Sequence, residues 1–217
     1  MAPIITFIGW HDSGKTTLAS QVVHQLTNFG YRIAVIKSTS DEGIAFDTPG
    51  TDTHKHKLAG AVGVMLVAPD QMVVQAGNRG LSLRTLAHRY FPDVDLVVGE
   101  GFKTARKVPK IEVLRNREQS LREEVQGIVA VATDLEGVAG DNVFPLNAVE
   151  EIAHFIEKRY LRATGRCEIA TLLVNGEKIP LKEFVQEALA GTVRGFVGSL
   201  KAGKEIQEIE LRLKFGE

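Results

Sequence analysis

FIGWHDSGKTT, residues 7–17, is the stretch of sequence that most constrains the fold of this chain. Within it, residues 9–16 match the pattern G-x4-G-K-[ST], a turn whose backbone N–H groups surround phosphate oxygens. The lysine of the pattern can reach the outer phosphates, and the threonine can offer its hydroxyl to Mg²⁺. An apolar run at residues 4–8 precedes the motif, and an amphipathic pattern at residues 15–29 follows it. The sequence therefore predicts a strand, a phosphate-binding loop and a helix that together hold a nucleoside triphosphate.

Short β-branched runs alternate with helical patterns over the first 160 residues or so. Several of the runs are apolar on both faces, as buried parallel strands are. The expected strands are residues 4–8, 32–37, 62–68, 94–99, 111–115 and 128–133, and the expected helices are residues 15–29, 81–91 and 148–161. This alternation predicts an α/β fold of the P-loop NTPase type, with a doubly wound, mostly parallel sheet, over residues 1–162.

The pattern changes after Tyr160, where residues 162–167 have the composition of a linker. Residues 169–181 predict a β-hairpin, because Asn175-Gly176 is a strong two-residue turn signal. A helix is expected at residues 181–193 and a half-buried strand at residues 205–215, where apolar and charged residues alternate. Residues 166–217 are thus expected to form a small α+β appendage, for which the sequence indicates no role.

Bulk composition limits the classes of partner. The 217 residues carry a formal net charge of -1, so no general attraction to nucleic acid or to an anionic membrane is expected. No apolar run approaches the length of a membrane span, and the amino terminus lacks the basic region of a signal peptide. The single cysteine, Cys167, fits a reducing compartment. We expect a cytoplasmic protein with neither nucleic-acid nor membrane partners.

Acidic side chains at strand ends are candidates for holding Mg²⁺ together with Thr16. Glu100 follows a buried strand and has a glycine on each side, which leaves room for close approach; the alternative is a solvated loop glutamate. Asp47 lies in a turn after the second strand, where it could serve as a ligand or only form an Asx turn. Lys37 ends the second strand and could face the phosphates or extend into solvent.

Several phrases, in order and spacing, resemble the molybdopterin-guanine dinucleotide biosynthesis protein B (MobB) family. They are GWHDSGKTTL at 9–18, RIAVIK at 32–37, FDTPGTDTHKHKLAGA at 46–61, DLVVGEGFKTARKVPKIEVLR at 95–115 and AVATD at 130–134. The resemblance covers about residues 3–160. The chain departs from the family pattern at residues 38–43, which lack the usual histidines, at Thr51 and Thr53, and at Gly99, where a larger apolar residue is usual.

The resemblance implies a homodimeric GTP-binding protein with at most slow, Mg²⁺-dependent hydrolysis. Such a protein assists the molybdenum cofactor guanylyltransferase that joins GMP to molybdopterin. By position, the nucleotide would be held by Gly9, Asp12, Ser13, Gly14, Lys15, Thr16 and Thr17, with Lys15 and Lys37 as the catalytic cations. Thr16, Asp47 and Glu100 would surround Mg²⁺. Asp134 would accept hydrogen bonds from the guanine N1–H and N2–H₂ edge, unless it is only a turn residue at a strand end.

The leading hypothesis is therefore a GTP-binding accessory protein of molybdenum cofactor maturation. An alternative is a stand-alone ATP-dependent enzyme, either a small-molecule kinase or a dethiobiotin-synthetase-like ligase, because the same loop, Lys37 and Glu100 would serve that chemistry. In a third hypothesis the appendage at residues 166–217 is the functional part, and it docks a molybdoenzyme apoprotein or another partner of cofactor insertion.

Overall fold

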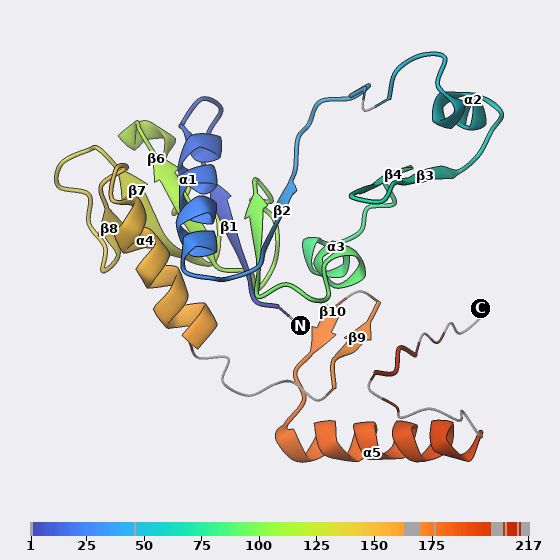
Figure 1. The fold of residues 1–217 in the computed structure, drawn as a ribbon. Helices are drawn as coiled ribbons and strands as arrows, with labels where there is room; N and C mark the ends of the chain where they lie inside the picture. Colours follow the sequence, from blue (N-terminus) through green and yellow to red (C-terminus); the bar gives the residue numbers. More distant parts are fainter. Residues whose placement is uncertain are drawn as a thin grey trace.

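A parallel sheet forms the centre of the computed structural model, which describes residues 2–45, 47–162, 170–175, 177–200, 206, 208–211 and 213 (Figure 1). Within these residues the sheet has six strands in the order β2-β5-β1-β6-β7-β8. The strands are β1 (Ile4–Ile8), β2 (Ile33–Lys37), β5 (Leu96–Glu100), β6 (Lys110–Leu114), β7 (Ile128–Thr133) and β8 (Val143–Phe144). Because all neighbouring pairs are parallel, the carboxyl ends of the strands lie along one edge.

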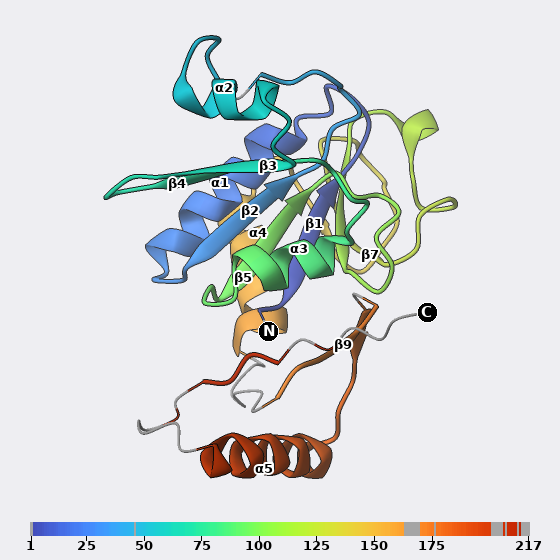
Figure 2. The same cartoon turned by 90° about the vertical axis from the view of Figure 1, so that its right-hand side faces the viewer.

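Helices cover both faces of this sheet (Figure 2). On one face, α1 (Lys15–Asn28) and α4 (Val149–Ile156) pack on a core that includes Phe7 and Val98; a π-helical turn at Glu157–Leu161 continues α4. On the other face, α3 (Leu83–Tyr90) packs through Leu83 and Ala87. The central strands are buried on both faces, which is why their sequences lack polar alternation. The prediction of a doubly wound, mostly parallel α/β fold is confirmed.

The strand expected at residues 62–68 forms, but it lies outside the main sheet. It is β3 (Gly63–Val67), and it pairs antiparallel with β4 (Met72–Ala76), a strand that the sequence did not predict. The two form a separate hairpin that projects with α2 (Asp52–Leu58) away from the sheet (Figures 1 and 2). A short apolar run does not reveal whether its partner is a buried sheet or one exposed neighbouring strand, so the sequence alone did not separate the two cases.

The appendage contains the predicted hairpin and helix. β9 (Leu172–Val174) pairs antiparallel with β10 (Glu177–Ile179), and Asn175 between them has the positive φ of 50° that such a turn requires. The helix, α5 (Glu183–Ser199), is longer at its carboxyl end than predicted. Part of the strand expected at 205–215 falls outside the described residues, and its described members, 206, 208–211 and 213, are not in a strand. None of the helices in the described residues is long and apolar enough to cross a membrane.

Close packing explains the glycine at position 99. Gly99 lies on β5 between Thr6 of β1 and Ile36 of β2. A Cβ atom added to Gly99 would lie 2.5 Å from Cγ2 of Thr6 and 3.1 Å from Cδ2 of Leu83. Thr6 and Leu83 therefore fill the space that a larger residue at position 99 would need.

Gly99→Ala is expected to lower the free energy of unfolding by about 1–3 kcal/mol, because the added methyl group must displace Thr6 or Leu83. Urea denaturation followed by circular dichroism measures the change. Gly77→Ala is the matched control, since no heavy atom lies within 4 Å of the added Cβ there. Thr6→Ser, which removes the clashing methyl group, should restore part of the loss in the double variant. A Gly99→Ala protein as stable as the wild type would contradict the packing argument.

Candidate functional site

The loop between β1 and α1 has the backbone that its glycines predict. Gly14 caps α1 with a φ of 87°, a left-handed conformation that glycine adopts without strain. At Gly9 an added Cβ would lie 2.6 Å from the carbonyl oxygen of Val113 and 2.7 Å from Oγ of Ser13, so the loop must pass close to β6. Asp12 also has a positive φ, of 56°, which aspartate tolerates better than most residues. The loop therefore ends at the amino terminus of α1, whose free N–H groups and positive dipole favour a bound anion.

The side chain of Lys15 lies against the phosphate loop and contacts Trp10 and Ser13 there. Its ammonium donates hydrogen bonds to the carbonyl oxygen of Trp10 and, at 3.5 Å, to Oγ of Ser13, which is itself buried. Burial, followed by the neighbouring positive charge of Lys103, lowers the pKa of the Lys15 ammonium. A phosphate oxygen would be a stronger acceptor than either of these neutral oxygens. Lys15 is therefore placed to bind an anion held by the loop.

Thr16, Glu100 and Lys37 meet at the carboxyl edge of the sheet. The Thr16 hydroxyl donates to Oε1 of Glu100 at 2.6 Å, and Nζ of Lys37 lies 3.2 Å from the same oxygen. The three come from separate elements, the first turn of α1 and the adjacent ends of β5 and β2. Glu100 is 7% exposed, so it is not the solvated loop residue of the alternative interpretation.

This cluster fits Mg²⁺ only as part of a larger ligand set. A hydroxyl and a carboxylate are the hard oxygen ligands that Mg²⁺ prefers. Within the described part of the chain, no group of three or more histidine, cysteine, aspartate or glutamate side chains could hold a metal by itself. An ion near Thr16 and Glu100 would therefore take its remaining oxygens from phosphate groups and water, as is usual for Mg²⁺ with a nucleotide.

The structure does not bring Asp47 to this cluster. Oδ1 of Asp47 accepts hydrogen bonds from the backbone N–H of Thr48 at 2.8 Å and from the hydroxyl of Thr51 at 2.7 Å. Bonds from the hydroxyls of Thr51 and Thr53 lower the pKa of this carboxyl. Thr51 also caps α2 by accepting from the N–H of His54, and α2 projects away from the sheet (Figure 1). In this conformation Asp47 has the local turn role that the sequence left open as the alternative.

Asp134 follows β7 and is linked to the phosphate loop through Arg115. Oδ2 of Asp134 lies 3.4 Å from Nη1 of Arg115, and Nε of Arg115 donates to the carbonyl oxygen of Ser13 at 3.1 Å. Both side chains are about half exposed. The sequence prediction did not include Arg115. The available signal was its position, since it ends the strand expected at residues 111–115, whose carboxyl end should lie at the same edge of the sheet as the loop.

Thr17 and Lys103 complete the surroundings of the loop. Thr17 lies exposed in the first turn of α1. Lys103, from the loop between β5 and β6, places its ammonium 4.5 Å from the centre of the Trp10 ring. The sequence contained Lys103 in the phrase EGFKT, but it did not predict a role for this residue. The site thus gathers side chains from α1, from the carboxyl ends of β2 and β5, and from the loops that follow β5, β6 and β7.

The family model for molybdopterin guanine dinucleotide synthesis protein B, MobB, matches residues 4–134, more than half of the chain. The chain belongs to the MobB family. A solved structure described as molybdopterin-guanine biosynthesis protein B superposes with a TM-score of 0.58 and 32% sequence identity, covering 71% of this chain and 98% of that one. The matched MobB region spans the phosphate loop, Glu100, Arg115 and Asp134.

Two MobB relatives differ in how much of the chain they match. The molybdopterin-guanine dinucleotide biosynthesis adapter protein of Escherichia coli is 29% identical over 172 residues, 76% of this chain and 97% of that protein. A Methanocaldococcus jannaschii protein whose name reads "putative molybdopterin-guanine dinucleotide biosynthesis adapter protein" is 26% identical over 232 residues, 97% of each chain. The second match therefore includes most of the appendage, whereas the first leaves about a quarter of the chain unmatched. Sequence similarity to this relative thus extends into the appendage.

Glu100→Gln is expected to reduce the gain in nucleotide affinity that Mg²⁺ provides by about tenfold, because one charged oxygen is lost from the cluster. Isothermal titration with GTP, with Mg²⁺ and with EDTA, measures this gain. Glu118→Gln, which removes the same charge from an exposed site in the 3₁₀ turn Arg117–Gln119, is the control. An undiminished effect of Mg²⁺ in Glu100→Gln would exclude Glu100 from the metal site.

Proposed function

We propose that this chain is a GTP-binding accessory protein of molybdenum cofactor maturation, which assists a guanylyltransferase that forms molybdopterin-guanine dinucleotide. One observation carries the proposal: in a chain of the MobB family, Lys15, Thr16 and Glu100 surround a phosphate loop at the carboxyl edge of the sheet. The adapter name of the Escherichia coli relative supports a helping role rather than a complete enzyme. In a reducing, cytoplasmic setting the single cysteine would remain a thiol.

The residues of the site have separable tasks in this proposal. The backbone N–H groups of residues 9–16 and the amino terminus of α1 bind the phosphates, and Lys15 neutralises the outer ones. Thr16 and Glu100 would hold Mg²⁺, while Lys37 balances the charge of Glu100. A bound Mg²⁺ would supply positive charge that offsets the charge of the phosphates. These groups bind and neutralise phosphate, and we expect hydrolysis to be slow at most.

Base selectivity is proposed to rest on Asp134. Its carboxylate follows β7 at the same edge as the loop, and it is about half exposed, so it is available to a ligand. A carboxylate accepts two hydrogen bonds from the guanine N1–H and N2–H₂ edge, whereas the matching edge of adenine has no N1–H. Arg115 joins Asp134 to the carbonyl oxygen of Ser13, and this contact would set the position of the carboxylate relative to the phosphates.

Wild-type protein is expected to bind GTP more tightly than ATP. Asp134→Asn should reduce this preference by about 1–3 kcal/mol, roughly fivefold to 150-fold, because an amide replaces one acceptor oxygen with a donor. Lys15→Ala should weaken binding of both nucleotides. Titration calorimetry with each nucleotide and Mg²⁺ measures the ratio, with the exposed Asp141→Asn as the control for lost charge. Equal or tighter binding of ATP by the wild type would favour the ATP-dependent kinase or ligase instead.

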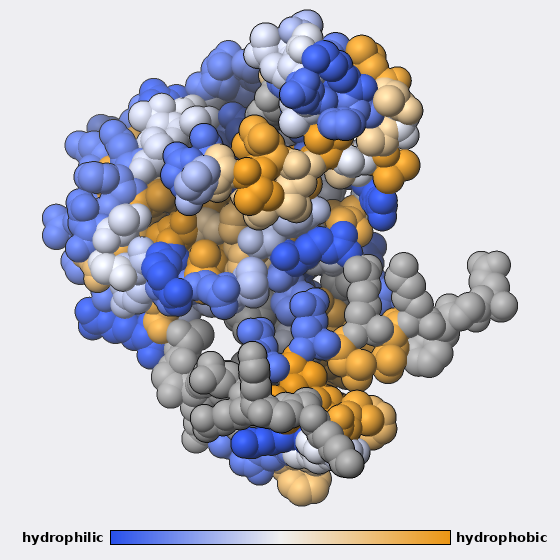
Figure 3. Space-filling model, turned by 45° about the vertical axis from the view of Figure 1, so that its right-hand side comes forward, coloured by the Kyte–Doolittle hydropathy of each residue, from blue (hydrophilic) through white to orange (hydrophobic). Residues whose placement is uncertain are grey.

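A second copy of the chain is proposed to cover the β3–β4 hairpin. An isolated two-stranded hairpin is marginally stable in water, and large exposed apolar patches mark interaction sites. The hairpin is exposed through the apolar side chains of Met65, Leu66, Val67, Met72, Val73 and Val74. Figure 3 shows apolar residues, in orange, in the upper half of the view, where the hairpin lies. Burial of this patch between two copies would explain a strand pair that is apolar on both faces.

Val67→Asp is therefore expected to convert a dimer into a monomer. Val67 is 70% exposed in the single chain, so the substitution should not disturb the fold of the subunit. Light scattering after size-exclusion chromatography gives the mass. Phe184→Asp places the same charge on a 77% exposed position of α5 and should leave the dimer intact. A monomeric wild type, or equal dissociation by both variants, would disprove the hairpin interface.

A further inference from the structure

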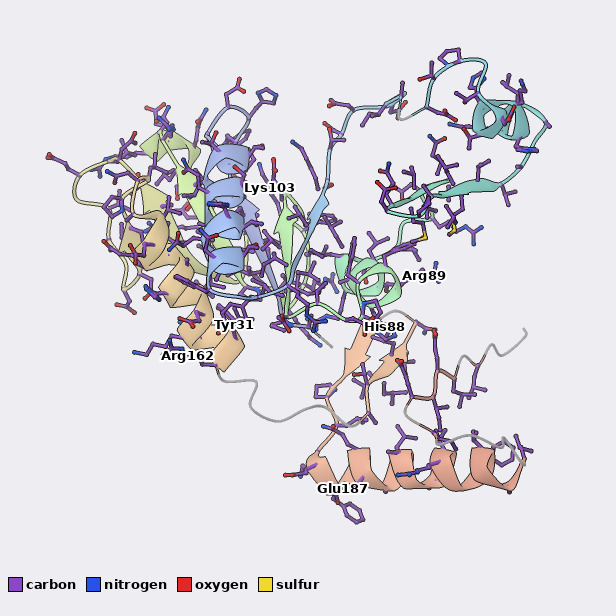
Figure 4. All side chains as sticks on the ribbon, in the orientation of Figure 1. Tyr31, His88, Arg89, Lys103, Arg162 and Glu187 are labelled. Atoms are coloured by element: carbon purple, nitrogen blue, oxygen red, sulfur yellow. The ribbon has the colours of Figure 1, made fainter. Side chains whose placement is uncertain are left out.

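Lys103 occupies a position over the phosphate loop that the mechanism above does not use. It lies three residues after Glu100, and its ammonium is 4.5 Å from the ring centre of Trp10. Trp10 belongs to the phosphate loop itself and is 43% exposed. Figure 4 shows Lys103 beside α1, the helix that begins at Lys15. Two lysines from different segments therefore flank the same turn.

The positive charges at this turn are only partly compensated by the protein. Lys37 has Glu100 at 3.2 Å. For Lys103, by contrast, the described residues supply no carboxylate within ion-pair distance, and its charge depresses the pKa of the nearby Lys15 ammonium. Lys15 itself is bonded to neutral oxygens of the loop. Lys15 and Lys103 thus repel each other, and an anion placed between them would relieve that repulsion.

Hydrogen bonds from Lys110 and Arg84 hold the backbone of the loop that carries Lys103. Lys110 is buried, and its ammonium donates to the carbonyl oxygens of Ala105 at 2.6 Å, Val108 at 3.0 Å and Gln126 at 2.9 Å. These three bonds use all of its protons. Nη2 of Arg84 on α3 donates to the carbonyl oxygen of Lys107 at 2.9 Å. These contacts hold the backbone of the loop at residues 105–108, and the Lys103 ammonium lies over the Trp10 ring.

We propose that Lys103 is a second phosphate-binding residue, which rests on the Trp10 ring in the free protein and moves to the terminal phosphate of a bound nucleoside triphosphate. A cation–π contact at an exposed site is weaker than a charge-assisted hydrogen bond to phosphate, so the triphosphate would win the competition. A diphosphate lacks the terminal group and would leave Lys103 on Trp10. The proposal rests on the nucleotide binding proposed above, and it makes Lys103 the residue that distinguishes GTP from GDP.

The chain has one tryptophan, so its fluorescence reports on Trp10 alone. The emission of wild-type protein should change more on titration with a non-hydrolysable GTP analogue and Mg²⁺ than with GDP and Mg²⁺. Lys103→Gln should abolish this difference and lower the GTP-to-GDP affinity ratio, measured by calorimetry, by about tenfold, the loss of one charged hydrogen bond. Lys103→Arg should restore most of the ratio.

Arg106→Gln is the matched control, because it removes the same charge from an exposed position of the same loop. It should leave both the fluorescence difference and the affinity ratio as in the wild type. An unchanged ratio in Lys103→Gln, or an equal loss in Arg106→Gln, would overturn the role of Lys103 while GTP binding itself stood. Wild-type protein that binds neither nucleotide would remove the proposed function and this inference together.

Discussion

The hydrogen bond between the Thr16 hydroxyl and the Glu100 carboxylate is the contact on which the site depends. It joins the helix that follows β1 to the end of the neighbouring strand β5, and Lys37 at the end of β2 shares the same oxygen. A carboxylate with so little exposure needs these partners, since burial of an unpaired charge is costly. β1 and β5 are neighbouring strands, and this brings Thr16 within reach of Glu100. Gly99 lies beside Thr6 and leaves room for the Thr6 side chain.

The sequence predicted the parts of this arrangement that follow from local rules. G-x4-G-K-T sets the phosphate loop, and strands that are apolar on both faces set a buried parallel sheet. Because parallel strands end at one edge, Glu100 was a candidate to lie near the loop, and Lys37 was left open between the phosphates and solvent. The structure places Nζ of Lys37 3.2 Å from Oε1 of Glu100. The hairpin at Asn175 was also predictable, because the sequence of a two-residue turn is a local signal.

The remaining features depend on tertiary contacts that local patterns do not encode. An apolar run at residues 62–68 has the same pattern whether it is buried in the main sheet or paired in an exposed hairpin, and only the structure separated the two. Oδ1 of Asp47 accepts a hydrogen bond from the hydroxyl of Thr51, four residues later, so a local turn holds a residue that the sequence offered as a metal ligand. Arg115 and Lys103 gain their positions from pairs far apart in the chain, Arg115 with Ser13 and Lys103 with Trp10.

Local charge at the phosphate loop also differs from the charge of the whole chain. A formal net charge of -1 suggests indifference to anions, yet Lys15, Lys37 and Lys103 converge on a turn where Glu100 and Asp12 are acidic neighbours. The bonds to Glu100 fix Lys37, and this leaves Lys15 and Lys103 to repel each other across the loop. An electrostatic field of this kind acts over the few ångströms in which a phosphate binds, where the distant acidic residues are screened by solvent. The electrostatic energy of the loop is therefore lowest when an anion is bound between these lysines. The arrangement of the lysine side chains thus depends on whether a ligand is bound.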